Sequence, residues 1–121
     1  MSVLGLGLDL CAIERIERAL QNERFLQRAF SEGERARIAQ RGAATAAGYF
    51  AAKEAAAKAL GCGFDGFFLD SIEIEPDALG CPQCILKGKA FERLRALGAS
   101  RVLITITHDA GMAAAVAVIA S

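Results

Sequence analysis

The sequence has no tryptophan, one tyrosine, one histidine and no net charge. Proteins that bind nucleic acids need a basic surface and often aromatic stacking platforms, so this composition argues against a nucleic-acid partner. The longest apolar run, residues 112–120, falls far short of the roughly 20 residues that a membrane-spanning helix needs. No basic segment opens the chain, so its start does not resemble a signal peptide. We therefore expect a cytoplasmic protein without membrane or nucleic-acid partners, with reduced cysteines.

The length of 121 residues suits one domain, 1–121, and the 54% hydrophobic and 23% charged content is typical of a folded protein. A chain of this size buries about two-thirds of its unfolded surface, which leaves little core around a deep cleft. An active site at the boundary between subunits would relieve that constraint.

The order of patterned segments predicts an α+β fold, with helices packed on an antiparallel sheet. Residues Val3–Leu10 alternate, with leucine at every second position and Gly5, Gly7 and Asp9 on the other face. Helical spacing, a capping box and glycine stops place helices at 13–20, from about 32 to Gly42, at 43–60 and at 91–97. Alternation places further strands at 71–75, 84–87, 101–108 and 112–120, the last apolar on both faces.

Three charges stand out in the alanine-rich helix expected at 43–60: Lys53, Glu54 and Lys58. On a helix, Glu54 and Lys58 lie about 40° apart, and Lys53 lies about 100° to the other side of Glu54. With Asp9, Glu54 would supply the two carboxylates that often hold Mg²⁺, and the lysines would neutralise phosphates. The alternatives are an exposed Glu–Lys pair and a helix N-cap at Asp9.

Two other features allow both a structural and a functional interpretation. His108, the only histidine, ends a predicted strand beside a turn, where it is either packed or catalytic. Arginines in the predicted helix at 13–20 and around the short apolar cluster at 25–30 form either a solvated face or a docking stripe for an acidic protein: Arg15, Arg18, Arg24 and Arg28. The Cys81–Cys84 CxxC motif lacks the partners of a zinc site and does not open a helix, which argues against zinc and redox roles.

Four segments, in order and at matching spacing from residue 3 to residue 120, resemble the holo-[acyl-carrier-protein] synthases, the short trimeric type of 4′-phosphopantetheinyl transferase. They are Gly5–Leu10 with Ile13–Glu17, Phe25–Ser31 with Glu34, Phe50–Gly63, and Ile104–Asp109. The third is the most specific, because it contains the Phe-Ala-Ala-Lys-Glu-Ala run followed by lysine.

The resemblance implies transfer of the phosphopantetheine arm of coenzyme A to a serine of apo acyl carrier protein, with adenosine 3′,5′-bisphosphate as the other product. Asp9 and Glu54 match the family's Mg²⁺ ligands. Lys58 matches its lysine near the pyrophosphate, and His108 matches its histidine at the coenzyme A site. Catalysis is thus expected of Glu54, Lys58 and His108, and coenzyme A binding of Lys53, Lys58, Thr107 and His108.

The resemblance also implies partners. Acyl carrier proteins are acidic, so they would dock on the four arginines named above. The short enzymes of this family are homotrimers with sites between protomers. Two rival functions use the same residues: a Mg²⁺-dependent phosphohydrolase, and a coenzyme A-binding trimer without catalysis.

The sequence departs from the family pattern at three positions. Tyr49 stands directly before the Phe-Ala-Ala-Lys-Glu-Ala run, where arginine is common, which affects one expected contact with a coenzyme A phosphate. Asp109 follows His108 where serine or threonine is commoner, and Cys81 stands in a turn that often holds a basic residue.

Overall fold

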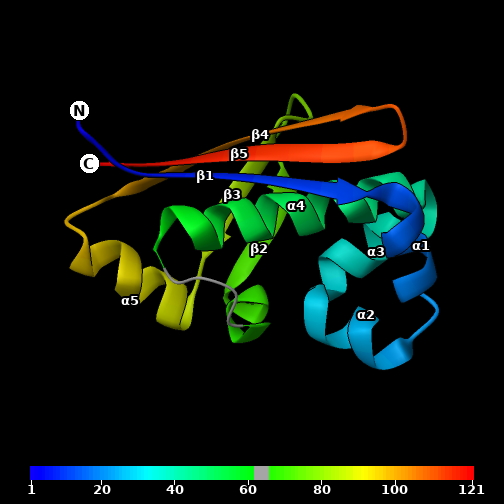
Figure 1. Cartoon of the computed structure of the whole chain (residues 1–121). Coiled ribbons are helices and arrows are strands. Elements are labelled where there is room, and N and C mark those ends of the chain that lie inside the picture. Colours follow the sequence, from blue (N-terminus) through cyan, green and yellow to red (C-terminus); the bar gives the residue numbers. More distant parts are fainter. Residues whose placement is uncertain (62–65) are drawn as a thin grey trace.

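A three-stranded antiparallel sheet and one long helix form the centre of the computed structural model, which describes residues 1–61 and 66–121 (Figure 1). The strands, in their order across the sheet, are β1 (Val3–Ala12), β5 (Met112–Ala120) and β4 (Arg101–Asp109). Helix α4 (Ala43–Ala59) lies along one face of this sheet. The first and last strands of the chain are thus neighbours, and both pack on the same helix.

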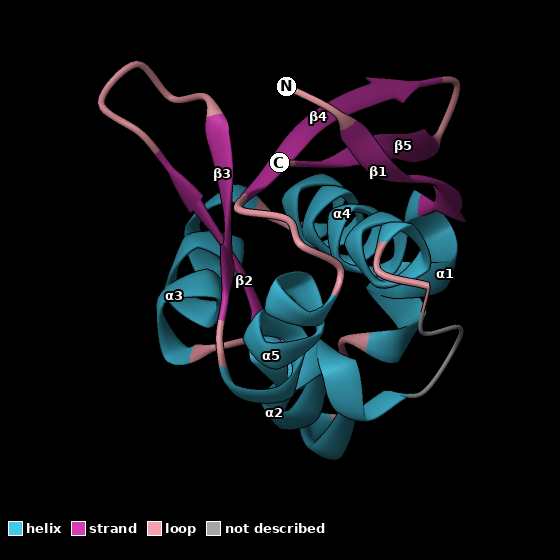
Figure 2. Ribbon diagram, turned by 90° about the vertical axis from the view of Figure 1, so that its left-hand side faces the viewer, coloured by secondary structure: helices cyan, strands magenta, loops and turns pink. Residues whose placement is uncertain are grey.

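Shorter elements surround α4 on its other sides (Figure 2). The helices are α1 (Ile13–Ala19), α2 (Glu23–Ala29), α3 (Glu32–Arg41), the 3₁₀ helix η1 (Gly66–Ser71) and α5 (Gly88–Ala96). A second sheet is the hairpin of β2 (Ile72–Pro76) and β3 (Pro82–Leu86), whose tip projects away from the helices. Gly42 separates α3 from α4 with a φ of 95°, a conformation that glycine adopts at little cost.

The glycine face of β1 allows the backbone of α4 to approach unusually closely. A Cβ atom on Gly7 would lie 1.9 Å from the carbonyl oxygen of Ala55, and one on Gly5 would lie 2.1 Å from that of Ala59. No side chain fits in that space, so glycine is required by the packing of helix on strand. The glycine face of β1 that the alternating pattern predicts is therefore occupied by helix α4.

A buried ion pair joins the other side of α4 to its neighbours. Lys53 Nζ lies 2.5 Å from Glu34 Oε1 and also donates to the carbonyl oxygen of Ala29 at 2.7 Å. Glu34 in turn accepts hydrogen bonds from the backbone N–H groups of Ser31 and Ile74. Both charged side chains are almost fully buried, so they depend on one another and on these partners.

The face of the sheet turned away from α4 is apolar and uncovered in the single chain. Leu6, Leu8 and Leu10 of β1 are 68%, 63% and 62% exposed, and Leu103 of β4 is 45% exposed. Pairing of Leu6 with Val118 continues this face onto β5. Such a contiguous apolar surface marks an interaction site.

The α+β architecture and the antiparallel sheet agree with the sequence prediction, with local differences. The second strand of the hairpin begins at Pro82, two residues before the predicted start, because Pro82 is already paired with Pro76. Strand 112–120 was expected to be buried on both faces, but only the face toward α4 is fully buried. Gly63, a predicted helix stop, lies outside the described residues. Among the described helices, none has the length and apolarity required to cross a membrane.

We predict that Glu34→Gln lowers the free energy of unfolding by about 3 kcal/mol, because it leaves the buried Lys53 ammonium without a counter-charge. Glutamine keeps only one oxygen acceptor, so one of the two backbone N–H groups, of Ser31 or of Ile74, also loses its partner and adds to the loss. Urea unfolding measures the change, with Glu14→Gln as a control that removes only the exposed pair with Arg18. Equal stability of the two variants would contradict this role for the pair.

Candidate active site

Asp9, Glu54 and Lys58 meet where the end of β1 passes α4. Lys58 Nζ lies 3.1 Å from Asp9 Oδ1 and donates to the carbonyl oxygen of Leu8 at 3.0 Å. Glu54 stands one helical turn before Lys58 and is only 4% exposed. The contact between α4 and the glycines of β1 therefore brings Asp9 to two charges of α4 that are far from it in the sequence. We call these three residues the acidic centre.

The electrostatics of the acidic centre set Glu54 apart from an ordinary surface carboxylate. Burial, and next the charge of Asp9, raises the pKa of the Glu54 carboxyl from 4.5 to about 7, although Lys58 and Arg15 act in the opposite direction. A carboxyl with this pKa exchanges protons near neutral pH, as a general base or acid must. A bound cation would compensate the repulsion between the Asp9 and Glu54 carboxylates and favour the ionised form of Glu54.

The donor set of the acidic centre fits a magnesium ion. In the described part of the chain, no cluster of three or more histidine, cysteine or acidic side chains is arranged to hold a metal. Asp9 and Glu54 would thus leave most coordination positions to water and substrate. Mg²⁺ binds in this way, through one or two carboxylates and the phosphate oxygens of its substrate.

Lys53 is not brought to the acidic centre. Its side chain leaves the opposite side of α4, where its ammonium is enclosed by Glu34 and the carbonyl oxygen of Ala29. Burial lowers the pKa of Lys53, and the nearby charge of Glu34 raises it. The structure therefore places Lys53 in a structural ion pair, although its spacing in the sequence put it on one arc with Glu54.

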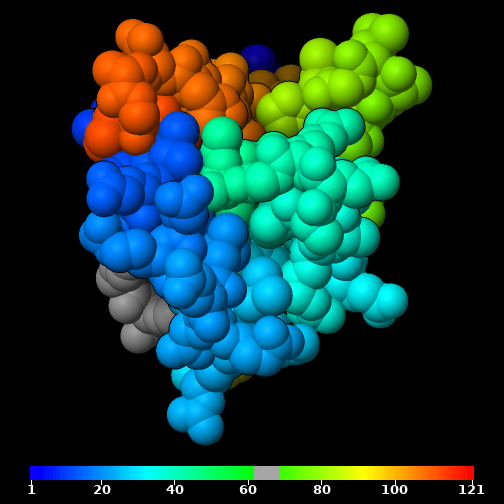
Figure 3. Space-filling model, turned by 90° about the vertical axis from the view of Figure 1, so that its right-hand side faces the viewer, coloured from blue at the N-terminus to red at the C-terminus, as the bar shows by residue number. Residues whose placement is uncertain are grey.

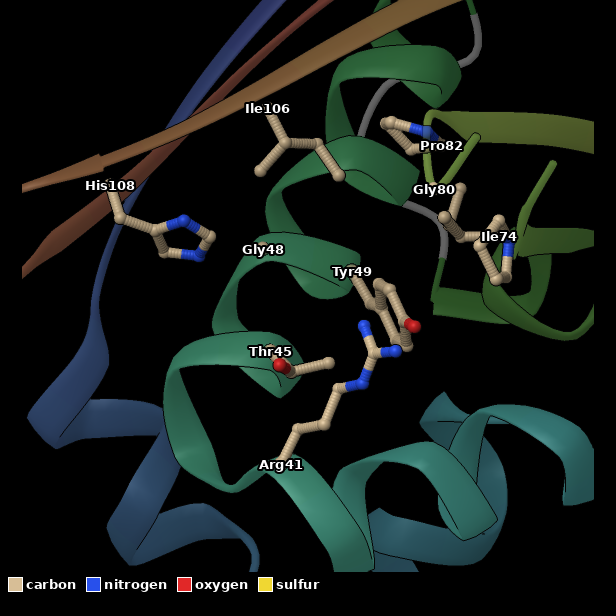
Figure 4. Close-up of a pocket in the computed structure, with 10 residues that line it drawn as sticks. Arg41, Thr45, Gly48, Tyr49, Ile74, Gly80, Pro82, Ile106 and His108 are labelled. Carbon is tan, nitrogen blue, oxygen red and sulfur yellow. The ribbon is translucent and has the colours of Figure 1, made fainter. Parts of the chain in front are cut away.

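His108 lines a pocket on another flank of α4 (Figure 4). Its Nε2 lies 2.8 Å from the carbonyl oxygen of Ala44, near the start of α4. A Cβ on Gly48 would come within 3.0 Å of Nε2, so this glycine makes room for the imidazole ring. The other walls come from α3, α4, β4 and the hairpin, with Arg41, Thr45, Tyr49, Ile74, Pro82 and Ile106 among the lining residues. We call this cavity the His108 pocket.

The acidic centre and the His108 pocket face different directions. Thr45 lies nine residues before Glu54 on the same helix, which corresponds to a rotation of about 180°. In the sheet, β5 separates β1, which carries Asp9, from β4, which carries His108. Within one chain, α4 and the sheet therefore stand between these two groups of residues.

Thr107 and Asp109 alternate with His108 along β4, so they belong to the opposite face of the strand. Both are exposed, and neither lines the His108 pocket. Thr107 thus lies on the uncovered apolar face of the sheet. The Asp109 carboxylate points away from the pocket, so it does not repel an anion bound there.

The four arginines of the predicted docking stripe are all exposed on α1 and α2 (Figure 3 shows both helices in blue, below the β4–β5 turn in orange). Arg18 is paired with Glu14 at 3.0 Å, a surface contact of little energetic value. Arg24 and Arg28 flank a shallow pocket that also contains Phe25. This face therefore combines positive charge with an apolar depression. It borders the acidic centre, because the charge of Arg15 acts on Glu54.

The CxxC cysteines do not form a common site. Cys81 is exposed, whereas Cys84 is half-buried on the hairpin, and both are free thiols. Burial raises the pKa of the Cys84 thiol to about 12, which makes it a poor nucleophile at neutral pH. A redox or zinc role gains no support from this arrangement. Cys62 lies outside the described residues.

Three residues of these sites were not predicted from the sequence pattern. Arg41 and Thr45 line the pocket with His108, and Glu34 is the partner of Lys53. A signal existed for Glu34, since it closes the capping box after Ser31, but that motif shows only the local hydrogen bonds. No sequence motif marks Arg41, because its position in the pocket wall depends on the turn at Gly42.

Comparisons with known proteins agree on one family. The model described as "4'-phosphopantetheinyl transferase superfamily" matches residues 5–115. The holo-[acyl-carrier-protein] synthase of Solidesulfovibrio magneticus is 45% identical over 120 residues, which cover 97% of this chain and 98% of the relative.

Two solved structures extend the similarity to the fold. The synthase of Helicobacter pylori in complex with coenzyme A has a TM-score of 0.83 at 31% identity, covering 95% of this chain and 99% of that one. The synthase of Neisseria meningitidis has a TM-score of 0.86 at 32% identity, covering 99% and 100%.

We predict that Glu54→Gln stabilises the metal-free protein at pH 8 and has little effect on stability near pH 4. Because the pKa of Glu54 is raised on folding, its carboxyl stabilises the native state when protonated, and this contribution is lost as pH rises from 4.5 through about 7. The expected gain for the variant at pH 8 is about 3 kcal/mol. Urea unfolding in a chelator measures it, with the exposed Glu17→Gln as control. A pH-independent difference would show that the burial of Glu54 does not shift its titration.

Proposed function

This chain belongs to the 4′-phosphopantetheinyl transferase superfamily, and we propose that it transfers the phosphopantetheine arm of coenzyme A to a serine of an apo acyl carrier protein. The observation that carries this function is the convergence of Asp9, Glu54 and Lys58 at one point of a fold that it shares with a coenzyme A-bound synthase. These residues provide what phosphoryl transfer needs, namely charge stabilisation and a proton acceptor.

The reaction breaks one phosphorus–oxygen bond and forms another. The serine oxygen attacks the phosphorus that carries the pantetheine arm, and the oxygen of adenosine 3′,5′-bisphosphate leaves with the electrons of the broken bond. The serine hydroxyl proton must pass to a base. Negative charge builds up on the transferred phosphoryl group and on the leaving oxygen. Positive groups fixed around them therefore lower the barrier.

We propose that Asp9 and Glu54 hold Mg²⁺ against the pyrophosphate of coenzyme A. When bound, the ion supplies positive charge where negative charge develops. The two carboxylates, one of them destabilised by burial and by its neighbour, support this assignment. Removal of the metal by a chelator should accordingly abolish transfer, and added Mg²⁺ should restore it.

The remaining roles follow from position and charge. Lys58, which already reaches Asp9, is placed to neutralise the pyrophosphate. Glu54, directly or through water, is the base that we favour for the serine proton, since its pKa lies near neutrality. His108 stands in a pocket with Arg41, where no acidic residue of the described part of the chain lines the wall, and it orients a phosphate of coenzyme A.

We propose that the carrier protein docks on α1 and α2. The exposed Arg15, Arg18, Arg24 and Arg28 provide a positive field, and Phe25 provides an apolar depression between Arg24 and Arg28. Arg15 lies close enough to influence Glu54, so a carrier on this face would bring its serine toward the acidic centre.

We further propose that the active enzyme is a homotrimer whose sites lie between protomers. The exposed leucines of β1 and Leu103 of β4 offer an apolar face that a second copy would cover. The acidic centre and the His108 pocket point in different directions within one chain. An interface that places the acidic centre of one protomer against the pocket of its neighbour would unite them.

Mass spectrometry of apo acyl carrier protein, incubated with coenzyme A and Mg²⁺, tests the proposed transfer. We expect the carrier to gain the mass of one phosphopantetheine group. Asp9→Asn should reduce the rate at least ~100-fold, as expected for the loss of fixed electrostatic stabilisation. Glu92→Gln, an exposed substitution on α5, should leave the rate unchanged and serves as control.

The same experiment separates the rival functions. Release of inorganic phosphate without a carrier would indicate a phosphohydrolase. Binding of coenzyme A without modification of the carrier would indicate a non-catalytic protein. Either result overturns the proposed transfer, provided that a reference synthase modifies the carrier under the same conditions.

Mixed oligomers test the shared site. Asp9→Asn and His108→Ala chains, each weakly active alone, should recover activity when co-expressed, because some interfaces then combine an intact acidic centre with an intact His108. Co-expression of Asp9→Asn with Lys58→Ala is the matched control: both changes damage the acidic centre, so no interface is intact. Equal activity in the two mixtures, with mixed oligomers confirmed by mass, would contradict a shared site.

A further inference from the structure

The floor of the His108 pocket contains a contact that the roles above do not use. Tyr49 is 8% exposed and lines the pocket from α4. From α3, Arg37 Nε donates to the Tyr49 hydroxyl oxygen at 2.9 Å, and the guanidinium carbon lies 5.5 Å from the centre of the phenol ring. A further nitrogen of Arg37 donates to the carbonyl oxygen of Ile74 on β2 at 2.6 Å. Arg37 is therefore fixed at two points and holds the phenol in place.

This contact leaves the proton of the Tyr49 hydroxyl free for a ligand. A phenol can accept one hydrogen bond and donate another. Arg37 uses the accepting side, and no bond from the hydroxyl to another residue in 1–61 or 66–121 accompanies it. Because Tyr49 lines the pocket, a ligand bound there is within reach of this hydroxyl as an acceptor for its proton.

The charge around the pocket indicates an anion. Arg41 extends its side chain toward Tyr49, and His108 approaches from the opposite wall (Figure 4). Arg37 adds a second positive charge directly behind the phenol. Among the residues that the structure describes, no aspartate or glutamate lines the pocket. A phosphate group bound here would meet a hydroxyl donor and positive charge without a competing carboxylate.

We propose that Tyr49, oriented by Arg37, donates a hydrogen bond to the 3′-phosphate of coenzyme A and selects for substrates that carry it. This proposal rests on the proposed function for the identity of the ligand. The pyrophosphate must lie at the acidic centre, where the bond is broken, whereas the 3′-phosphate does not react and occupies a separate position on the ribose. Tyr49 is a binding residue and Arg37 a positioning residue.

Comparison of coenzyme A with 3′-dephospho-coenzyme A tests the proposal directly. Tyr49→Phe keeps the ring and removes the hydroxyl, which is both the donor to the ligand and the acceptor for Arg37 Nε. We expect it to raise KM for coenzyme A about tenfold, with kcat changed less than about twofold, as for a lost hydrogen bond to a charged group. With 3′-dephospho-coenzyme A the variant and the unaltered enzyme should have the same KM, because the acceptor is absent.

Arg37→Met should reproduce the effect of Tyr49→Phe, and the double variant should be no worse than the poorer single variant, because Arg37 acts through the phenol. Arg37→Lys, which retains the charge, should recover part of the affinity. The control is Arg35→Met on the same helix, which also loses a hydrogen bond to a backbone carbonyl, that of Phe30, but does not touch the pocket. Equal losses for both substrates, or the same KM change in Arg35→Met, would overturn the proposal.

Calorimetric binding of adenosine 3′,5′-bisphosphate and of adenosine 5′-monophosphate separates this proposal from the proposed function. Tyr49→Phe should weaken binding of the bisphosphate about tenfold and leave the monophosphate unchanged. That result would support the site even if the protein failed to modify a carrier. Unchanged binding of the bisphosphate would reject the site even if transfer occurred.

Discussion

Helix α4 rests with its backbone against strand β1, and most of the molecule's chemistry depends on that contact. Because Gly5 and Gly7 carry no side chains, the carbonyl oxygens of Ala55 and Ala59 occupy the space where Cβ atoms would stand. This approach places Glu54 and Lys58 beside Asp9. The acidic centre is thus a consequence of backbone packing. Its carboxylates are close because the glycines of β1 let α4 approach the strand closely.

The same helix carries a different kind of contact on each of its other sides. Lys53 enters the buried ion pair with Glu34, which connects α4 to α2, α3 and β2. Gly48 admits His108 from β4, and Tyr49 meets Arg37 from α3. One alanine-rich helix therefore anchors the core, the acidic centre and the His108 pocket.

A chain this short has little room for a deep cleft, and the arrangement of its polar groups reflects this. The acidic centre and the His108 pocket lie on separate flanks of α4, and the apolar face of β1, β5 and β4 is uncovered. All three features are explained together if a second copy covers the sheet and completes the site. The small size of the domain and the proposed sharing of active sites then have one physical cause.

Periodicity and local motifs in the sequence predicted most of the helices and strands, the α+β class, the glycine face of β1, and Asp9, Glu54 and Lys58 as candidates for one site, whereas the 3₁₀ helix η1 was not predicted. These signals are local, since alternation, helical spacing and capping act over a few residues. Three further features depend on the tertiary structure. Lys53 forms an ion pair with Glu34, Arg37 donates a hydrogen bond to Tyr49, and Thr107 lies on the uncovered face of the sheet. Residues about 100° apart on a helix contact different neighbours, and those neighbours are set by long-range packing that no local pattern contains.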